Sequence, residues 1–208
     1  MMNINIRKAE EKDASFLAEM ILQSTRAGKK YGIFDLVFPS KDDTKVKHCI
    51  EQLTISSAKN HCHYTNFLIA EVDGKSVGTL CSYEPRISNQ EAFMAALDET
   101  GCEHASLDDL DILRECDFGL NNRTLMFDFM EEINGFEDVG ILKALMQKSL
   151  LTARLKGYRI AQTIVEKGSL EILLDYKKLG FKEVREKECE LYKEKFGRSG
   201  LILLSIDF

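Results

Sequence analysis

The fold of this chain is decided by one stretch, Gly168-Ser169-Leu170-Glu171-Ile172-Leu173-Leu174-Asp175-Tyr176-Lys177-Lys178-Leu179-Gly180-Phe181. Ser169 has a side chain suited to an N-cap. Apolar residues then recur near helical spacing, at Leu170, Leu173, Leu174 and Leu179. Gly180 stands where a left-handed residue commonly ends a helix. We therefore expect a short helix, capped by Ser169 and stopped at Gly180, that turns directly into a strand.

The rest of the chain alternates between strand and helix patterns. Asp73-Gly74 between two apolar runs is the strongest short signal for a hairpin. Residues 67–72 are nearly all apolar, so we expect that strand to be covered on both faces. The expected strands are 4–8, 66–72, 75–83, 123–132, 158–165, 181–184 and 201–206. The other expected helices follow Asp13 or cover about 41–55, 90–97, 107–113 and 140–155, with a loop at 26–34. This order fits a mixed sheet flanked by helices.

Length and composition restrict the class of protein. The chain has 208 residues, of which 44% are hydrophobic and 30% charged, as in ordinary globular proteins. We expect one domain over residues 1–208, since no linker or internal repeat is visible. The net charge of −6 argues against a nucleic-acid partner. No segment has the length and apolar character of a signal peptide or a membrane span, so we expect a cytoplasmic protein without membrane contact.

The cysteines and histidines suggest no metal site. The six cysteines are scattered without a Cys-x-x-Cys pair, and we expect them to be free thiols: Cys49, Cys62, Cys81, Cys102, Cys116 and Cys189. His61-Cys62-His63 places two imidazoles on the same side of an extended segment. Structural zinc sites rarely use that spacing, and the sequence offers no obvious fourth ligand. We therefore expect no metal.

Residues 84–117 differ from the rest in being strongly acidic. Arg86 and Arg114 are the only cations in this segment, against ten carboxylates. Two short helices are expected here, at 90–97 and 107–113. The segment is either a helical insertion with a solvated face or a lid whose carboxylates attract a cationic substrate.

The ending Tyr176-Lys177-Lys178-Leu179-Gly180-Phe181 resembles the Tyr-x-x-x-Gly-Phe ending of the fourth helix in GNAT-type N-acetyltransferases. The opening Ile6-Arg7-Lys8-Ala9-Glu10-Glu11-Lys12-Asp13-Ala14 is similar to that family's first strand and turn. The resemblance covers most of the chain apart from 84–117. It implies an α/β (α+β) fold with a GNAT-like mixed, mostly antiparallel sheet flanked by helices, and a helical insertion. It also implies acetyl-CoA as acyl donor and Tyr176 as the acid that protonates the leaving thiolate.

The resemblance places the cofactor loop at 137–142. The family pattern is Arg/Gln-x-x-Gly-x-Gly/Ala, whose backbone N–H groups bind the CoA diphosphate at a helix start. Gly140 matches, whereas Glu137 and Leu142 depart from the pattern. Ser169 stands where the family commonly has an asparagine. The cofactor-binding residues that the resemblance implies are Met130, Glu132, Val139, Gly140, Ile141, Leu142, Lys143 and Ser169.

A general base is expected on the fourth strand, because the attacking amine must lose a proton. In the family a carboxylate of that strand, or a water held by it, often serves. Strand alternation predicts Asp128, Met130 and Glu132 on one face and Phe127, Phe129 and Glu131 on the other. We expect Asp128 to be the base, with Glu132 as the second choice.

The resulting hypothesis is an acyl-CoA-dependent N-acyltransferase that moves acetyl from acetyl-CoA to a primary amine. The acceptor would be a small molecule, such as a polyamine or aminoglycoside, or a lysine side chain. An alternative is a catalytically inactive GNAT-like module for ligand sensing or interaction, which Glu137 and Leu142 favour. Another alternative keeps the enzyme but uses a longer acyl donor. Whether the chain forms a homodimer is left open by the sequence.

Overall fold

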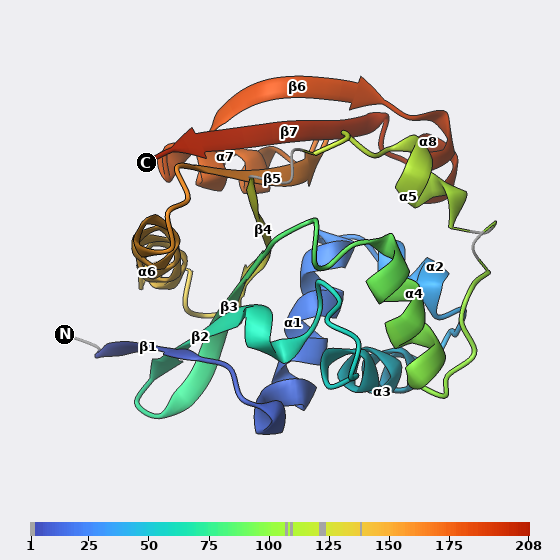
Figure 1. Cartoon of the computed structure of the whole chain (residues 1–208), viewed down its shortest axis with the longest axis horizontal. Coiled ribbons are helices and arrows are strands. Elements are labelled where there is room, and N and C mark those ends of the chain that lie inside the picture. The colour runs from blue at the N-terminus through green and yellow to red at the C-terminus, as the bar shows by residue number, and fades with distance from the viewer. Residues whose placement is uncertain (1–2, 107, 109, 121–123, 138) are drawn as a thin grey trace.

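The chain forms a seven-stranded mixed sheet with helices on both faces (Figure 1). The computed structural model describes residues 3–106, 108, 110–120, 124–137 and 139–208. The strand order is β1-β2-β3-β4-β5-β7-β6. Neighbouring strands are antiparallel except β4 and β5, which are parallel. The strands are β1 (Ile4–Lys8), β2 (Phe67–Val72), β3 (Lys75–Tyr83), β4 (Leu125–Glu132), β5 (Ile160–Glu166), β6 (Lys182–Glu188) and β7 (Gly200–Asp207).

The helices divide between the two faces of the sheet. A first core joins the sheet to the N-terminal helices and to α4, and a second joins it to α6 and α7. The α-helices are α1 (Ala14–Arg26), α2 (Ile33–Val37), α3 (Asp43–Thr54), α4 (Gln90–Glu99), α5 (Asp111–Glu115), α6 (Ile141–Leu155), α7 (Leu170–Lys178) and α8 (Glu190–Phe196). Short 3₁₀ turns precede α1 (Glu11–Asp13) and β2 (Tyr64–Asn66). The mixed sheet flanked by helices confirms the predicted fold class.

Most predicted elements lie where the patterns placed them, with three additions. Helix α2 begins inside the stretch 26–34 that we expected to be a loop, and α8 follows β6, which extends to Glu188. Two expected segments include residues outside the described ones, the strand at residue 123 and the helix at residues 107 and 109. Helix α5 starts at Asp111, later than predicted.

Helix α1 buries the predicted stripe, but its cap differs. Leu17, Met20 and Ile21 are fully buried against the sheet. Asp13 precedes the helix without capping it through its side chain. Its carboxylate instead accepts a hydrogen bond from the Glu10 N–H at 2.8 Å and pairs with Arg7 at 2.7 Å. The buried ion pair fixes the turn between β1 and α1.

Helix α7 ends as predicted but begins and packs differently. Gly180 has φ +103°, which supports the predicted stop. Ser169 occupies the N-cap position but makes no side-chain cap, because its hydroxyl turns to Glu166. Leu170 and Leu174, two of the apolar residues at helical spacing, are 67% and 53% exposed. The buried residue of the helix is Tyr176.

A β-bulge in β4 separates side chains that simple alternation would group. Along β3, Thr79 pairs with Glu131 and Cys81 with Asp128, so β4 contains one extra residue. Phe129 has φ +46°, a left-handed conformation that bulky residues rarely adopt. Phe127 packs in the core beside α6 and Phe129 in the core beside α1. The predicted face shared by Phe127 and Phe129 is therefore wrong, and Met130 likewise turns away from Asp128 toward the α6 side.

Strands β4 and β5 diverge just beyond their first paired residues. Their register covers only Leu125 with Ala161 and Met126 with Gln162. Beyond these pairs, β4 continues to Glu132 and β5 to Glu166 without pairing to each other. The bulge lies in the diverging part of β4. Backbone groups on the inner edges of both strands consequently border an opening in the sheet.

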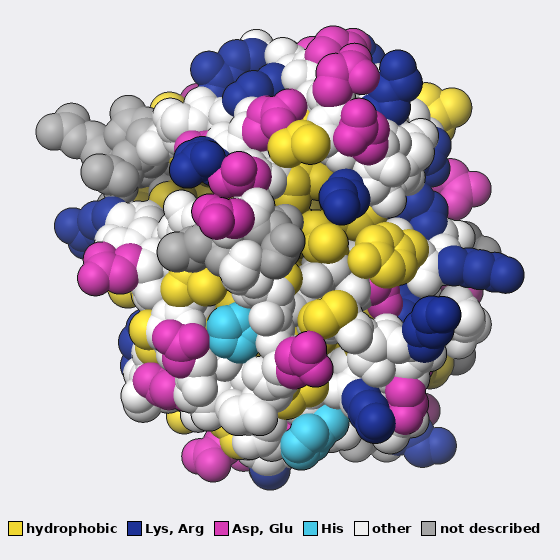
Figure 2. All heavy atoms as spheres, turned by 90° about the vertical axis from the view of Figure 1, so that its right-hand side faces the viewer, with side chains coloured by type: hydrophobic (Ala, Val, Ile, Leu, Met, Phe, Trp, Pro, Cys, Tyr) yellow, Lys and Arg dark blue, Asp and Glu magenta, His cyan; other side chains and the backbone are white. Residues whose placement is uncertain are grey.

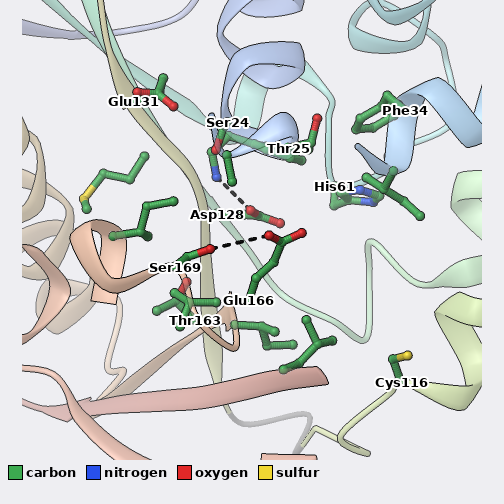
Figure 3. Close-up of a pocket in the computed structure, with 18 of the residues that line it drawn as sticks. Ser24, Thr25, Phe34, His61, Cys116, Asp128, Glu131, Thr163, Glu166 and Ser169 are labelled. Atoms are coloured by element: carbon green, nitrogen blue, oxygen red, sulfur yellow. Dashed lines mark hydrogen bonds between the residues drawn. The ribbon is translucent and has the colours of Figure 1, made fainter. Parts of the chain in front are cut away.

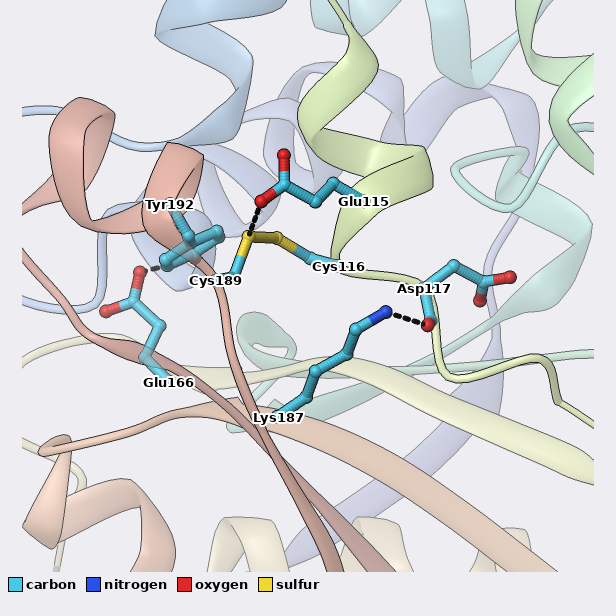
Figure 4. Close-up of a disulfide and its surroundings, with 7 residues drawn as sticks. All are labelled: Glu115, Cys116, Asp117, Glu166, Lys187, Cys189 and Tyr192. Carbon is cyan, nitrogen blue, oxygen red and sulfur yellow. Dashed lines mark hydrogen bonds between the residues drawn. A yellow bond between two sulfur atoms is a disulfide. The ribbon is translucent and has the colours of Figure 1, made fainter.

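Four of the six cysteines form disulfides, which corrects the expectation of free thiols. Cys49 of α3 pairs with Cys102, and Cys116 after α5 pairs with Cys189 before α8 (Figure 4). Only Cys62 and Cys81 are free, and both are buried. Residue spacing gave no sign of these pairs, since each joins segments far apart in sequence. Disulfides are uncommon in the cytoplasm, so the cytoplasmic location stays a prediction with this observation against it.

Among the residues that the structure describes, no helix combines the length and the apolar character needed to cross a membrane.

Candidate active site

A cavity of about 450 Å³ occupies the opening between β4 and β5 (Figure 3). Residues 128–131 of β4 and 163–166 of β5 line it, and α1, α2, α4 and α7 close it from both faces of the sheet. This volume lies in the range of small-ligand sites. The divergence of two parallel strands thus creates the main concave site in the described part of the chain.

Tyr176, the expected acid, lines this cavity from α7. Its side chain is 4% exposed and contacts the Phe181 ring edge-on at 5.1 Å between centroids. Burial raises the pKa of the phenol, while a hydrogen bond with Thr163 opposes the rise. A phenol with a raised pKa stays protonated at neutral pH. Tyr176 therefore lines the cavity in its protonated form, although the raised pKa makes it a weaker acid than a free phenol.

Asp128 reaches the same cavity from the bulge of β4. One of its oxygens, Oδ1, accepts a hydrogen bond from the Phe129 N–H at 2.8 Å. Burial raises the pKa of this carboxyl to about 6, and the Phe129 N–H opposes that rise. Within the described residues Asp128 forms no salt bridge. A carboxylate that titrates near neutrality is suited to take a proton from a ligand.

The predicted cofactor residues separate into two groups. Met130, Leu142 and Ser169 line the cavity together with Asp128 and Tyr176. The remaining five, near the start of α6, do not line it: Glu132, Val139, Gly140, Ile141 and Lys143. Gly140 precedes α6 with φ +89°, so it starts the helix as predicted. Asp138 of the same loop lies outside the described residues.

The start of α6 carries negative charge where a diphosphate was expected. Burial raises the pKa of Glu132 to about 7, and Glu137, Glu131 and Asp175 add to that rise. A hydrogen bond from the Leu142 N–H opposes it. The Glu132 Oε2 atom is buried with no partner among the described atoms.

This arrangement does not fit a diphosphate while Glu132 is ionised. The carboxylate already engages one N–H at the helix start, and like charges repel. The neighbouring Glu137 carboxylate is held by the Gly135 N–H at 2.9 Å. The cavity near Tyr176 fits a thioester arm, but the helix start needs Glu132 to be neutral or displaced.

Aromatic side chains surround one end of the cavity, and no local sequence motif predicts that they meet. The His61 ring lies 4.8 Å from Phe93 and 5.9 Å from Phe129, between centroids. Phe34 lies 6.4 Å from both of these phenylalanines. Tyr83 lies 5.7 Å from His61. Burial lowers the pKa of His61 to about 4, so its imidazole is neutral at physiological pH.

Glu166 forms a second polar cluster in the cavity that sequence reasoning missed. Its buried carboxylate pairs with Lys29 and accepts a hydrogen bond from the Tyr192 hydroxyl at 2.6 Å. Arg198 lies 3.6 Å away, and Ser169 donates a hydrogen bond at 3.4 Å. These residues come from both ends of the chain, so no local motif could have indicated them. The positive charges of Lys29 and Arg198 therefore already balance the Glu166 carboxylate.

The acidic segment 84–117 covers the cavity with apolar residues. Phe93, Ile112, Leu113 and Cys116 line it, and of the segment's described carboxylates only Asp117 does. Some of the others form ion pairs outside the cavity, as Asp98 does with His104 and Asp111 with Arg114. On the face that includes α4 and α5, hydrophobic side chains gather among interspersed charges of both signs (Figure 2). The segment is therefore a cover for the cavity and not an acidic funnel into it.

His61 and His63 do not share a site. His61 contacts the cavity rings, whereas His63 packs on Tyr64 at 4.6 Å and bonds to Thr65 through Nδ1. The segment is a turn and not extended, so the two imidazoles point to different neighbours. In the described part of the chain no group of three His, Cys, Asp or Glu side chains could hold a metal ion.

Comparison with known proteins gives structural but no sequence relatives. No family model matches the chain, and no curated protein matches it. An N-acetyltransferase from Staphylococcus aureus Mu50 has a TM-score of 0.70 at 15% identity, with 97% of this chain and 100% of that chain covered. An acetyltransferase of the GNAT family from Streptococcus pneumoniae has a TM-score of 0.55 at 16% identity, with 99% of each chain covered.

A third structure was solved with a ligand. The PaiA N-acetyltransferase from Thermoplasma acidophilum, in complex with coenzyme A, has a TM-score of 0.55 at 15% identity, with 100% of each chain covered. At such low identity these likenesses establish architecture alone. The chain therefore has a GNAT-type fold, as the Tyr176 motif predicted.

Proposed function

We propose that the protein is an acyl-CoA-dependent N-acyltransferase that moves acetyl from acetyl-CoA to a primary amine of a small molecule or a lysine side chain. One observation carries the proposal: Asp128 and Tyr176 line the same cavity at the divergence of β4 and β5. A base and an acid that line one space match the kind of proton transfers that the reaction needs. The coenzyme A complex of the Thermoplasma acidophilum protein supports the choice of donor.

The proposed roles follow from the two environments. Asp128, with a pKa near 6, accepts the proton of the acceptor ammonium and so frees its lone pair. The amine nitrogen then forms a bond to the thioester carbonyl carbon, and the carbon–sulfur bond breaks. Tyr176, which is protonated before the reaction, gives its proton to the departing sulfur. The nitrogen then loses its second proton, which passes through solvent to restore the phenol, and Asp128 releases its own proton to solvent. The cover of apolar residues from 84–117 limits water near the reacting groups.

The test compares acetyl transfer by the wild type and by Tyr176→Phe over a panel of amines. Loss of the acid is expected to lower kcat on the order of 10²-fold, with the Kd for coenzyme A nearly unchanged. Tyr64→Phe is the control, because Tyr64 does not line the cavity. Equal turnover in the wild type and Tyr176→Phe would remove Tyr176 from the mechanism.

A non-catalytic ligand-sensing module is the second candidate. The position of Glu132 at the start of α6 favours it, because this carboxylate occupies the place of a donor anion. Calorimetric titration with coenzyme A separates the two candidates. Binding accompanied by transfer supports the enzyme, whereas no heat at any pH between 6 and 8 supports the module.

A further inference from the structure

The inner end of the cavity combines aromatic walls with a carboxylate. Phe34, Phe93 and Phe129 come from α2, α4 and β4. The ring centroid of Phe34 lies 6.4 Å from that of Phe93 and 6.4 Å from that of Phe129. All three are nearly fully buried yet line the cavity. Asp128 stands directly before Phe129 in the bulge. An aromatic enclosure with one negative group is suited to an organic ammonium ion.

Of the five carboxylates that line the cavity, Glu166 and Asp175 have cation partners, whereas Asp117, Asp128 and Glu131 form no ion pair among the described residues. Of these three, Asp128 is the one next to an aromatic residue of the enclosure, Phe129. Lys29 and Arg198 face Glu166, and Lys178 pairs with Asp175 at 2.9 Å. The neighbouring His61 is neutral at physiological pH. A buried carboxylate without a counter-ion is unfavourable, and a bound cation would remove that penalty.

We propose that this end of the cavity is the acceptor site for a primary monoamine on an apolar, ring-sized body. The ammonium pairs with Asp128, and the body packs among Phe34, Phe93 and Phe129. The inference rests on the proposed transferase activity and names its acceptor class.

The lining disfavours the polyamine and aminoglycoside acceptors that the acidic segment suggested. Most of what 84–117 adds to the lining is apolar, namely Phe93, Ile112, Leu113 and Cys116, and these side chains offer a second ammonium no acceptor. The carboxylates of 84–117, apart from Asp117, do not line the cavity. A long acyl chain would suit the apolar walls, but it would leave Asp128 without a counter-charge. A monoamine satisfies both the walls and the carboxylate.

The experiment measures binding by calorimetry at pH 8 without any acyl donor, using the full chain with its disulfides intact. The probes are 2-phenylethylamine, the neutral 2-phenylethanol, and spermidine. We expect 2-phenylethylamine to bind at least tenfold more tightly than either of the others. Equal or tighter binding of spermidine, or of the alcohol, overturns the proposal. The proposal is also overturned if octanoyl-CoA competes with 2-phenylethylamine while acetyl-CoA does not, because the apolar end would then hold an acyl chain.

Two variants test the contacts, each with a matched control. Asp128→Asn is expected to weaken 2-phenylethylamine binding more than tenfold, and Phe93→Leu about threefold to thirtyfold through the lost ring. Asp98→Asn is the control for Asp128→Asn, because it removes a carboxylate of 84–117 that does not line the cavity. Phe38→Leu is the control for Phe93→Leu, because it removes a buried ring that does not line the cavity. Unchanged affinity in Asp128→Asn or Phe93→Leu contradicts the proposal. Thermal unfolding identifies any variant that fails to fold, and Phe93→Tyr then replaces Phe93→Leu with the ring retained and binding expected.

Failure of the inference can be told apart from failure of the proposed activity. Acetyl transfer to spermidine without binding of 2-phenylethylamine supports the transferase and overturns the acceptor class. Binding of 2-phenylethylamine without transfer from acetyl-CoA supports the amine site and overturns the activity.

Discussion

Burial of the Asp128 carboxyl links the charge of this residue to the stability of the fold. Its pKa is raised from 3.8 to about 6, so the folded protein holds a proton there that the unfolded chain releases. The contribution of Asp128 to the free energy of unfolding therefore falls as the pH rises from about 4 to about 6. Above that window the loss is complete and constant.

Asp128→Asn should remove this loss. Relative to the wild type, the variant is expected to gain stability as the pH rises through 4–6, by up to about 3 kcal/mol at pH 7. Below pH 4 the two proteins should differ little, because the carboxyl is neutral in both states. Urea unfolding across pH 3.5–8 measures the difference. A constant difference at all pH values would show that the Asp128 pKa is not raised.

Glu132 offers a second test at the residue scale. Because its pKa is raised to about 7, the carboxylate becomes charged as the pH rises from 6 to 8 and should then repel a diphosphate. We expect coenzyme A to bind more weakly at pH 8 than at pH 6, and Glu132→Gln to bind it at least fivefold more tightly at pH 8. Calorimetry at both pH values gives the result. Glu51→Gln is the control, because Glu51 neither lines the cavity nor contributes to the Glu132 pKa. Weaker binding in Glu132→Gln would contradict the assignment.

Single residues were predictable where a local motif fixed them. Tyr176 and Gly180 follow from one helix ending, and Asp128 follows from the resemblance on the fourth strand. The faces of β4 were not predictable, because the bulge at Phe129 depends on pairing with β3, which lies about fifty residues earlier in the chain. Ser169 failed as a cap for a similar reason: Glu166 binds its hydroxyl.

At the scale of elements, long or strongly patterned segments were predicted and short ones were missed. The hairpin and α6 carry their own signals in turn chemistry and periodicity. Helices α2 and α8, of five and seven residues, are too short to be stable alone. They form because Phe34 and Phe196 are buried by distant parts of the chain. The aromatic end of the cavity depends on such contacts, so the sequence could not show it.

The packing of α6 on the sheet depends on Gly78 of β3. A Cβ atom there would lie 2.6 Å from the Ile141 Cγ2 atom and 3.0 Å from the Glu131 backbone oxygen. Gly78→Ala should therefore push the first turn of α6 outward and lower the free energy of unfolding by about 1–3 kcal/mol. Ser76→Ala on the same strand should change it by less than about 0.5 kcal/mol. Urea unfolding of both variants decides the matter, and equal stability would contradict the close approach.

At the scale of the whole molecule, both disulfides tie the segment 84–117 to distant helices. Their loops span 53 and 73 residues. The double variant Cys116→Ala/Cys189→Ala is expected to lose about 4 kcal/mol of stability by the chain-entropy estimate for such a loop. Guanidinium unfolding with and without a reducing agent measures the loss. If the reducing agent does not change the stability of the wild type, the cysteines are free thiols, as the sequence suggested.

The short pairing between β4 and β5 has a consequence for motion. Only Leu125 and Met126 join the N-terminal part of the sheet to β5, β7 and β6 through the strand register. The two halves therefore share few backbone hydrogen bonds at the centre of the molecule, where sheets are usually most rigid. Amide hydrogens from Asp128 to Met130 should exchange with deuterium faster than those of β2 and β7. A ligand bound between β4 and β5 would slow that exchange. Amides at the centre of the sheet, and not those in surface loops, would therefore show that the cavity is occupied.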